Sequence, residues 1–186
     1  MKVSIIIGAT RRGAVGPAIG EWVKESVRAA GHEAELIRLA DFDVPFFDME
    51  QLPAQVNKQY PHDSVMRWSR AIDEAEALLI VSPEYNHGIP GALKNAIDWL
   101  WDEWSDKPTG IVTYSGGPIG GARAAIQLRA VLGHVGVRLS RYDVAIGRAH
   151  GAVPTDAEEG IRKVLTDQLE QLAVFSAQTT KKSSEI

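Results

Sequence analysis

Hydrophobic residues along this chain fall into two alternating patterns, short apolar runs and longer stretches with helical spacing. Two of the runs, 77–81 and 110–114, are almost wholly apolar and bounded by turn-forming residues. Such runs are typical of strands buried on both faces of a sheet. A third run, 2–7, is short and β-branched, 33–39 alternates, and 135–146 contains a fifth strand with an interrupted pattern. The sequence therefore predicts five strands.

Between these runs, apolar residues recur every three or four positions, the spacing of one face of a helix. In the first such stretch Ile19, Val23 and Val27 share a face, and Gly31 ends it. Pro90 stands near the start of another, a position that proline tolerates in a helix. The expected helices are 17–30, 62–75, 91–101, 122–132 and 156–175.

Strands that alternate with helices form a parallel sheet covered on both faces through right-handed crossovers. For five strands we expect an α/β fold, a flavodoxin-like three-layer α/β/α sandwich with strand order 2-1-3-4-5. One domain is expected over 1–175, followed by a polar, frayed tail over 176–186. The segment 41–60, with two prolines and several acidic residues, is expected to be an irregular excursion over the surface.

Composition and charge exclude several classes of protein. The chain has 186 residues, 45% hydrophobic and 24% charged, which are ordinary values for a globular domain. Its net charge of −4 argues against a nucleic-acid partner, which requires clustered Lys and Arg. The absence of cysteine suits a reducing cytoplasm. No apolar stretch is long enough to cross a bilayer, so no membrane partner is expected, and no metal-ligand spacing is present.

Three loops of turn-forming residues follow the first, third and fourth predicted strands, over 8–16, 83–88 and 115–121. In an open α/β sheet these loops meet at one carboxyl edge, where ligands bind. The first loop combines small residues with Arg11 and Arg12 and leads into a helix, whose first N–H groups and dipole favour an anion. We expect a single phosphate bound by backbone N–H groups and Arg11. A solvated turn with two surface arginines is the competing interpretation.

The first loop lacks the two common nucleotide-binding motifs. Ala14 and Val15 follow Gly13 where a Walker loop requires Lys and Ser or Thr. Thr10 stands where a dinucleotide-binding motif requires its second glycine. The third loop is rich in glycine, which allows a backbone to approach a flat ligand closely. A ligand with one phosphate and one flat polar ring satisfies all three loops, and FMN is the obvious candidate.

Three stretches resemble the NAD(P)H-dependent FMN reductase family of flavodoxin-like proteins. The family's Gly-Ser-x-Arg loop corresponds to 8–11, and its Ser-x-Gly-x-x-Gly-Gly-x-Arg-Ala segment corresponds to 115–124. Its longest motif, Pro-Glu-Tyr-Asn-x-x-x-Pro-Gly-x-Leu-Lys-Asn-Ala-x-Asp, is unbroken from 83 to 98. The resemblance extends over nearly the whole chain, to about Leu172.

The resemblance implies that the three loops hold FMN. The residues that it assigns to the phosphate are Thr10, Arg11, Val15 and Gly16. Those that border the isoalloxazine are Pro83, Glu84, Tyr85, Asn86 and His87, and the backbone N–H groups of this segment, which Pro83 lacks, face its N5/O4 edge. Those that lie against its pyrimidine end are Ser115, Gly116 and Gly117. No side chain is expected to carry the chemistry, because the flavin N5 does so.

The resemblance also implies a reaction and an assembly. NADPH or NADH passes hydride to the flavin, and a flat small-molecule acceptor, such as free flavin or a quinone, then takes its place in a ping-pong mechanism. Family members build the acceptor pocket across subunits, which implies a homodimer or homotetramer. The helix expected over 91–101 has a broad apolar arc that includes Trp101 and has Trp99 at its border. Together with Trp104, these tryptophans are consistent with a subunit interface. A helix packed inside one chain is the competing interpretation.

The chain departs from the family at two loop positions, because Ala9 and Ala14 stand where serines are common. Each missing hydroxyl hydrogen bond costs roughly 0.5–1.5 kcal/mol, so looser flavin binding is expected. A non-enzymatic FMN-binding electron carrier is the alternative function, but it predicts a Thr-rich phosphate loop and a strongly acidic face. A flavin-free scaffold domain is a third interpretation, which the intact motif over 83–98 argues against.

Overall fold

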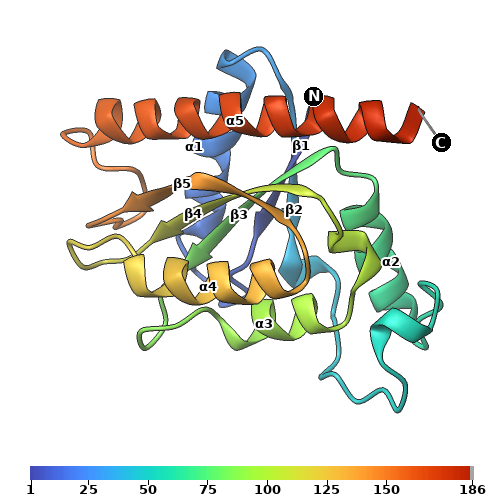
Figure 1. Cartoon of the computed structure of the whole chain (residues 1–186). Helices are drawn as coiled ribbons and strands as arrows, with labels where there is room; N and C mark the ends of the chain where they lie inside the picture. The colour runs from blue at the N-terminus through green and yellow to red at the C-terminus, as the bar shows by residue number, and fades with distance from the viewer. Residues whose placement is uncertain (185–186) are drawn as a thin grey trace.

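The computed structural model describes residues 1–184, and strands alternate with helices along the chain (Figure 1). The strands are β1 Lys2–Ile7, β2 Glu33–Arg38, β3 Ala77–Pro83, β4 Pro108–Tyr114 and β5 Arg138–Ile146. The α-helices are α1 Gly16–Ala29, α2 Asp63–Asp73, α3 Gly91–Asp98, α4 Ala122–His134 and α5 Glu158–Ser184. Short 3₁₀ turns lie at Leu39–Asp41, Pro53–Gln55 and Asp102–Trp104.

All neighbouring strands run parallel, in the order β2-β1-β3-β4-β5. The predicted α/β fold and strand order are therefore confirmed. The sequence predicts an interruption in the fifth strand. The structure has a shift in the register of β5 against β4, opposite the β4 residues Thr109 to Ile111. Because every strand is parallel, all the strand-to-helix loops that follow them emerge at one edge of the sheet.

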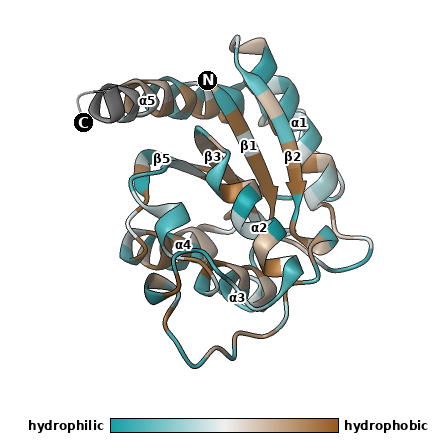
Figure 2. Cartoon of the chain, turned by 90° about the vertical axis from the view of Figure 1, so that its right-hand side faces the viewer, coloured by the Kyte–Doolittle hydropathy of each residue, from teal (hydrophilic) through white to brown (hydrophobic). Residues whose placement is uncertain are grey.

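Two apolar layers enclose the sheet, and Figure 1 shows the helices divided between its faces. Helices α1 and α5 pack on one face, where Ile19 and Leu165 are fully buried. Helices α2, α3 and α4 cover the other face, which contains the buried Trp68 and Leu128. In Figure 2 hydrophobic residues concentrate along the strands, and hydrophilic residues lie mainly on the outer surface of the helices. The core thus lies between sheet and helices on both sides.

The helix expected over 91–101 ends earlier, at Asp98. Two of the three tryptophans that follow this end belong to the core. Trp99 and Trp104 are fully buried, and their indole N–H groups donate to the carbonyls of Pro45 at 2.7 Å and Ile97 at 3.2 Å. These two residues therefore pack inside the chain, but they lie beyond the end of α3 and not on the helix. Trp101 alone of the three remains partly exposed, at 37%.

Helix α5 is longer than the sequence predicts. The helix end expected near Phe175 is wrong, because α5 continues to Ser184, whereas the division into a domain over 1–175 and a tail over 176–186 stays a prediction. Residues 185–186 of the expected tail lie outside the described part of the chain. Across residues 1–184, no helix combines the length and the apolar character needed to span a bilayer.

The irregular segment 41–60 is fixed to the helices by a buried carboxylate. Glu103 is 1% exposed and accepts hydrogen bonds from the Tyr60 hydroxyl at 2.9 Å and from the Ser69 hydroxyl. The Trp101 N–H donates to the same carboxylate at 3.3 Å. Burial, and then proximity to the Glu103 carboxylate, raise the pKa of Tyr60, so this phenol remains a neutral donor. The carboxylate joins the end of the excursion to α2 and to the turn after α3.

We predict that Glu103→Ala lowers the free energy of unfolding by about 3 kcal/mol, because buried hydroxyl donors lose their acceptor. Urea denaturation of the variant beside wild type measures this loss. Glu25→Ala, at an exposed position of α1, is the matched control and should change stability by less than about 0.5 kcal/mol. Equal losses for the two variants would contradict the structural role of Glu103.

Candidate functional site

Hydrogen bonds that continue beyond the strands join the three predicted loops at the carboxyl edge. The Gly8 N–H donates to the Val81 carbonyl at 2.9 Å, which ties the first loop to β3. The Glu84 N–H donates to the Tyr114 carbonyl at 3.1 Å, which ties the second loop to β4. The Ser115 N–H donates to the Ile146 carbonyl at 3.1 Å. The sheet therefore sets the position of each loop relative to the next.

The first loop presents donors at the start of α1. Thr10 and Arg11 are exposed, and Val15 precedes the helix without any side-chain cap. Pro17 occupies the first turn, which contains no acidic residue. The N–H groups of Thr10 and Val15 make no hydrogen bond within the described chain, whereas the Ala14 N–H donates to the Arg11 carbonyl. Free donors, a cation and a helix N-terminus suit an anion.

Gly16 brings this loop into close contact with the end of β4. A β-carbon at Gly16 would lie 2.7 Å from the Tyr114 hydroxyl oxygen and 3.2 Å from Cγ2 of Ile7. Any larger residue would therefore push the helix start away from the sheet. The contact requires glycine at this position.

The second loop forms a tight turn. Tyr85 and Gly88 exchange backbone hydrogen bonds of 2.9 and 3.0 Å around Asn86 and His87. Both central residues have positive φ, 50° and 68°, as a type I′ turn requires. This conformation is strained for a non-glycine residue, and such strain concentrates at functional sites. Asn86 and His87 are exposed residues, and their N–H groups have no acceptor among the described residues.

Hydrogen bonds of two side chains, Glu84 and Gln127, attach this turn to α4. The Glu84 carboxylate, 10% exposed, accepts from the N–H groups of Arg123 at 3.1 Å and Ala124 at 3.4 Å. These belong to the first turn of α4, whose N-cap, Gly121, has no side chain to satisfy them. Gln127 accepts the Ile89 N–H at 2.7 Å. The N–H and the carboxylate of Glu84 are both hydrogen-bonded within the chain, so Glu84 holds the loop in position. The resemblance, by comparison, implies that Glu84 borders the flavin ring.

The third loop lies against a fourth loop, residues 147–157 between β5 and α5, which the sequence analysis did not predict as part of the site. The carbonyls of Ser115 and Gly117 accept from the N–H groups of Ala149 at 3.0 Å and Arg148 at 2.9 Å. Gly116 faces His150, since a β-carbon there would lie 3.5 Å from the imidazole Cε1. A β-carbon at Gly147 would clash with the Pro118 carbonyl oxygen, so this position has no room for a side chain. A glycine directly after the fifth strand is the sequence signal that could have indicated this loop.

Tyr114 is the second residue that the sequence reasoning missed. It ends β4, is 4% exposed, and its hydroxyl makes no hydrogen bond with any described residue. Burial, and then the Tyr85 hydroxyl, raise the pKa of Tyr114, whereas Arg11 and the Gly16 N–H lower it. Arg11 and Tyr85 from the first two loops therefore lie close enough to act on one hydroxyl. In sequence Tyr114 is indistinguishable from an ordinary core residue.

These observations place the predicted residues at one edge and fit FMN. Free donors and Arg11 in the first loop suit a phosphate, and the N–H groups of Asn86 and His87 suit the polar edge of a ring. Exposed Gly116 and Gly117 leave the third loop open to a flat ligand. Residues 1–184 contain no cluster of His, Cys, Asp and Glu that could hold a metal ion.

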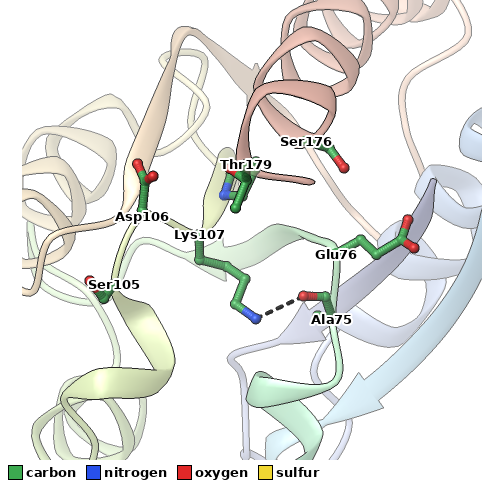
Figure 3. Close-up of a pocket in the computed structure, with 8 residues that line it drawn as sticks. Ala75, Glu76, Ser105, Asp106, Lys107, Ser176 and Thr179 are labelled. Atoms are coloured by element: carbon green, nitrogen blue, oxygen red, sulfur yellow. Dashed lines mark hydrogen bonds between the residues drawn. The ribbon is translucent and has the colours of Figure 1, made fainter. Parts of the chain in front are cut away.

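A cavity of about 300 Å³ lies at the opposite, amino edge of the sheet (Figure 3). Within it, the Lys107 ammonium donates to the carbonyls of Ala75 at 2.8 Å and Asp73 at 2.9 Å. Burial lowers the pKa of Lys107, and the nearby Asp73 carboxylate opposes this effect. A cation at the carboxyl end of α2 is stabilised by the helix dipole. This lysine therefore has a structural role, remote from the four loops.

Known proteins resemble this chain over most of its length. A family model for NADPH-dependent FMN reductase matches residues 1–151. The NAD(P)H-dependent FMN reductase ntnL of Nectria sp is 38% identical over 132 residues, which cover 68% of this chain and 65% of that protein. The quinone reductase of Escherichia coli K12 is 33% identical over 136 residues, which cover 71% and 69%. The structure of FerB, a flavoenzyme NAD(P)H:(acceptor) oxidoreductase from Paracoccus denitrificans, has a TM-score of 0.77 at 24% identity, covering 94% of this chain and 98% of that one.

The fold and the edge of the sheet define a flavin-dependent oxidoreductase of flavodoxin-like fold. The chain belongs to the NADPH-dependent FMN reductase family, whose cofactors are FMN and NAD(P)H. The family predicted from the three sequence motifs is therefore confirmed.

We predict that Glu84→Ala destabilises the protein by about 1 kcal/mol, because two N–H groups of α4 lose their cap. Arg123→Ala removes only the exposed 3.5 Å ion pair to the same carboxylate and should change stability by less than about 0.5 kcal/mol. Thermal unfolding of both variants measures the difference. A larger loss for Arg123→Ala would show that the ion pair, not the cap, holds the loop.

Proposed function

We propose that this chain is an NAD(P)H-dependent reductase that holds FMN across the carboxyl edge and passes hydride from a nicotinamide to a flat acceptor, such as free flavin or a quinone. The observation that carries the proposal is the strained turn of Asn86 and His87, which holds two unpaired N–H groups beside the open third loop. Bound FMN supplies the redox chemistry, because its N5 accepts hydride and returns it. The protein supplies binding, orientation and electrostatics.

In this proposal each loop has one task. Thr10, Arg11, Val15 and Gly16 bind the phosphate through backbone N–H groups and the guanidinium. The Asn86 and His87 N–H groups donate to the N5/O4 edge of the ring, where they favour negative charge. Pro83, Glu84 and Tyr85 fix the position of the turn that carries them. Ser115, Gly116 and Gly117 lie against the pyrimidine end.

The openness of the edge supports a ping-pong mechanism. Tyr85, His87 and Gly116 are all exposed, so the ring face beside them is accessible to solvent. One accessible face accommodates one flat partner at a time, so NADH or NADPH must leave before the acceptor enters. The names of the two relatives, an FMN reductase and a quinone reductase, support free flavin and quinone as acceptor classes.

A homodimer or homotetramer is part of this proposal. Phe46, Leu52 and Trp101 are exposed at 87%, 62% and 37%. Leu52 and Trp101 line an open hollow of about 460 Å³ together with His134, whose ring lies 5.7 Å from that of Trp101. Exposed apolar clusters of this kind mark interaction surfaces. The proposal implies a compartment that contains NAD(P)H, such as the cytoplasm.

Steady-state kinetics with added FMN test the proposed activity. We expect NADH or NADPH oxidation that depends on FMN and on a quinone, with parallel double-reciprocal lines as the acceptor concentration varies. Intersecting lines would contradict the ping-pong step. Saturable FMN binding without nicotinamide oxidation would instead support the electron carrier.

We predict that Arg11→Gln raises the Kd for FMN by about tenfold, because a charge-assisted hydrogen bond to the phosphate is lost. Quenching of flavin fluorescence on titration measures the Kd. Arg28→Gln, on the last turn of α1 and far from the loop that carries Arg11, is the matched control and should leave the Kd unchanged. Equal effects of the two substitutions would remove Arg11 from the phosphate site.

A further inference from the structure

The Tyr114 hydroxyl is a buried polar group without a partner. Its side chain is 4% exposed and lies in the core layer with Ile7 and Ile19, below the start of α1. No described residue accepts the hydroxyl proton, and the nearby Gly16 N–H, which lowers the Tyr114 pKa, does not meet the oxygen with normal hydrogen-bond geometry. A buried hydroxyl left unpaired is destabilising, and such groups are rare in native structures. A ligand atom would satisfy it.

The Tyr114 hydroxyl lies beside Ala9, a position of the first loop that has no hydroxyl. A β-carbon at Gly16 would be 2.7 Å from the Tyr114 oxygen and 3.4 Å from the methyl group of Ala9. Tyr114 and Ala9 therefore border the same small space at the N-terminus of α1. Ala9 and Ala14 offer no hydroxyl, so the donors of the loop itself are its backbone N–H groups, the exposed Thr10 hydroxyl and the side chains of Arg11 and Arg12.

We infer that Tyr114 is a flavin-binding residue whose hydroxyl donates a hydrogen bond to the FMN phosphate, in place of a hydroxyl at Ala9. The inference rests on the proposed function, because it assumes that the first loop binds the phosphate. A phenol reaches this position from the end of β4, two strands away from β1 in the sheet order. The sheet, and not the loop, thus supplies this hydroxyl donor.

The charges around the hydroxyl suit this role. Burial raises the pKa of Tyr114, so the phenol keeps its proton and remains a donor. The Arg11 guanidinium acts on the same oxygen, and the helix dipole of α1 adds positive potential there. A neutral donor between a cation and a helix N-terminus favours a phosphate oxygen over an uncharged acceptor.

The test is Tyr114→Phe, which removes the hydroxyl and keeps the ring. We expect the Kd for FMN to rise by about tenfold, as for one lost hydrogen bond to a charged group, while the Kd for riboflavin, which has no phosphate, is unchanged. The ligand-free variant should have a urea midpoint at or above that of wild type, because the unpaired hydroxyl is gone. Weaker cofactor binding combined with undiminished stability is a result that general structural damage does not produce.

Two further variants sharpen the test. Tyr142→Phe on β5, whose ring lies 5.1 Å from the Arg141 guanidinium and outside the four loops, is the matched control and should leave both Kd values unchanged. Ala9→Ser in the Tyr114→Phe background should recover part of the FMN affinity, because it returns a hydroxyl to the same space.

An unchanged Kd for FMN in Tyr114→Phe would overturn the inference. Equal weakening of FMN and riboflavin would also overturn it, because the hydroxyl would then contact the sugar chain or the ring. Failure of the proposed function looks different, since wild type would then show no saturable binding of either flavin.

Discussion

The site depends on backbone hydrogen bonds that continue beyond the strand ends. Gly8 with Val81, Glu84 with Tyr114 and Ser115 with Ile146 extend the pairing of the sheet into its loops. The strands β1, β3 and β4 are buried almost throughout between the helical layers, so these loops cannot shift relative to one another without disturbing the core. The packing of the sheet interior therefore fixes the relative positions of the loops at its carboxyl edge.

Within that frame, the second loop keeps a conformation that its residues do not favour. Asn86 and His87 both have positive φ, and two side chains on opposite sides of the turn hold it: Glu84 through the start of α4 and Gln127 through the Ile89 N–H. Their bonds to α4 offset the strain of the turn. The turn in return directs two N–H groups outward, where a ring edge needs donors. Within the motif over 83–98, Asn86 and His87 thus have N–H groups without acceptors among the described residues, whereas Glu84 holds the turn in place.

The sequence predicted the fold well because alternation of buried strands and amphipathic helices leaves few topologies. Strand β1 was predicted with its observed bounds, and the strand order was correct. The helix after Pro90 was predicted too long, because Trp99 fits helical periodicity although tertiary contacts with Pro45 bury it beyond the helix end. The buried role of Glu103 could not be predicted, since a carboxylate in a polar segment is ordinarily exposed. Tyr114 was missed for the opposite reason, because an aromatic residue at a strand end resembles core. Both depend on partners distant in sequence.

The central claim is that the loops after β1, β3 and β4 bind one mononucleotide together. Amide chemical shifts of isotope-labelled protein, recorded as FMN is added, test it most directly. The account predicts that the largest changes fall on Thr10, Asn86, His87 and Gly116, while the amides around Lys107 at the amino edge stay in place. Changes centred on Lys107, or confined to a single loop, would contradict it.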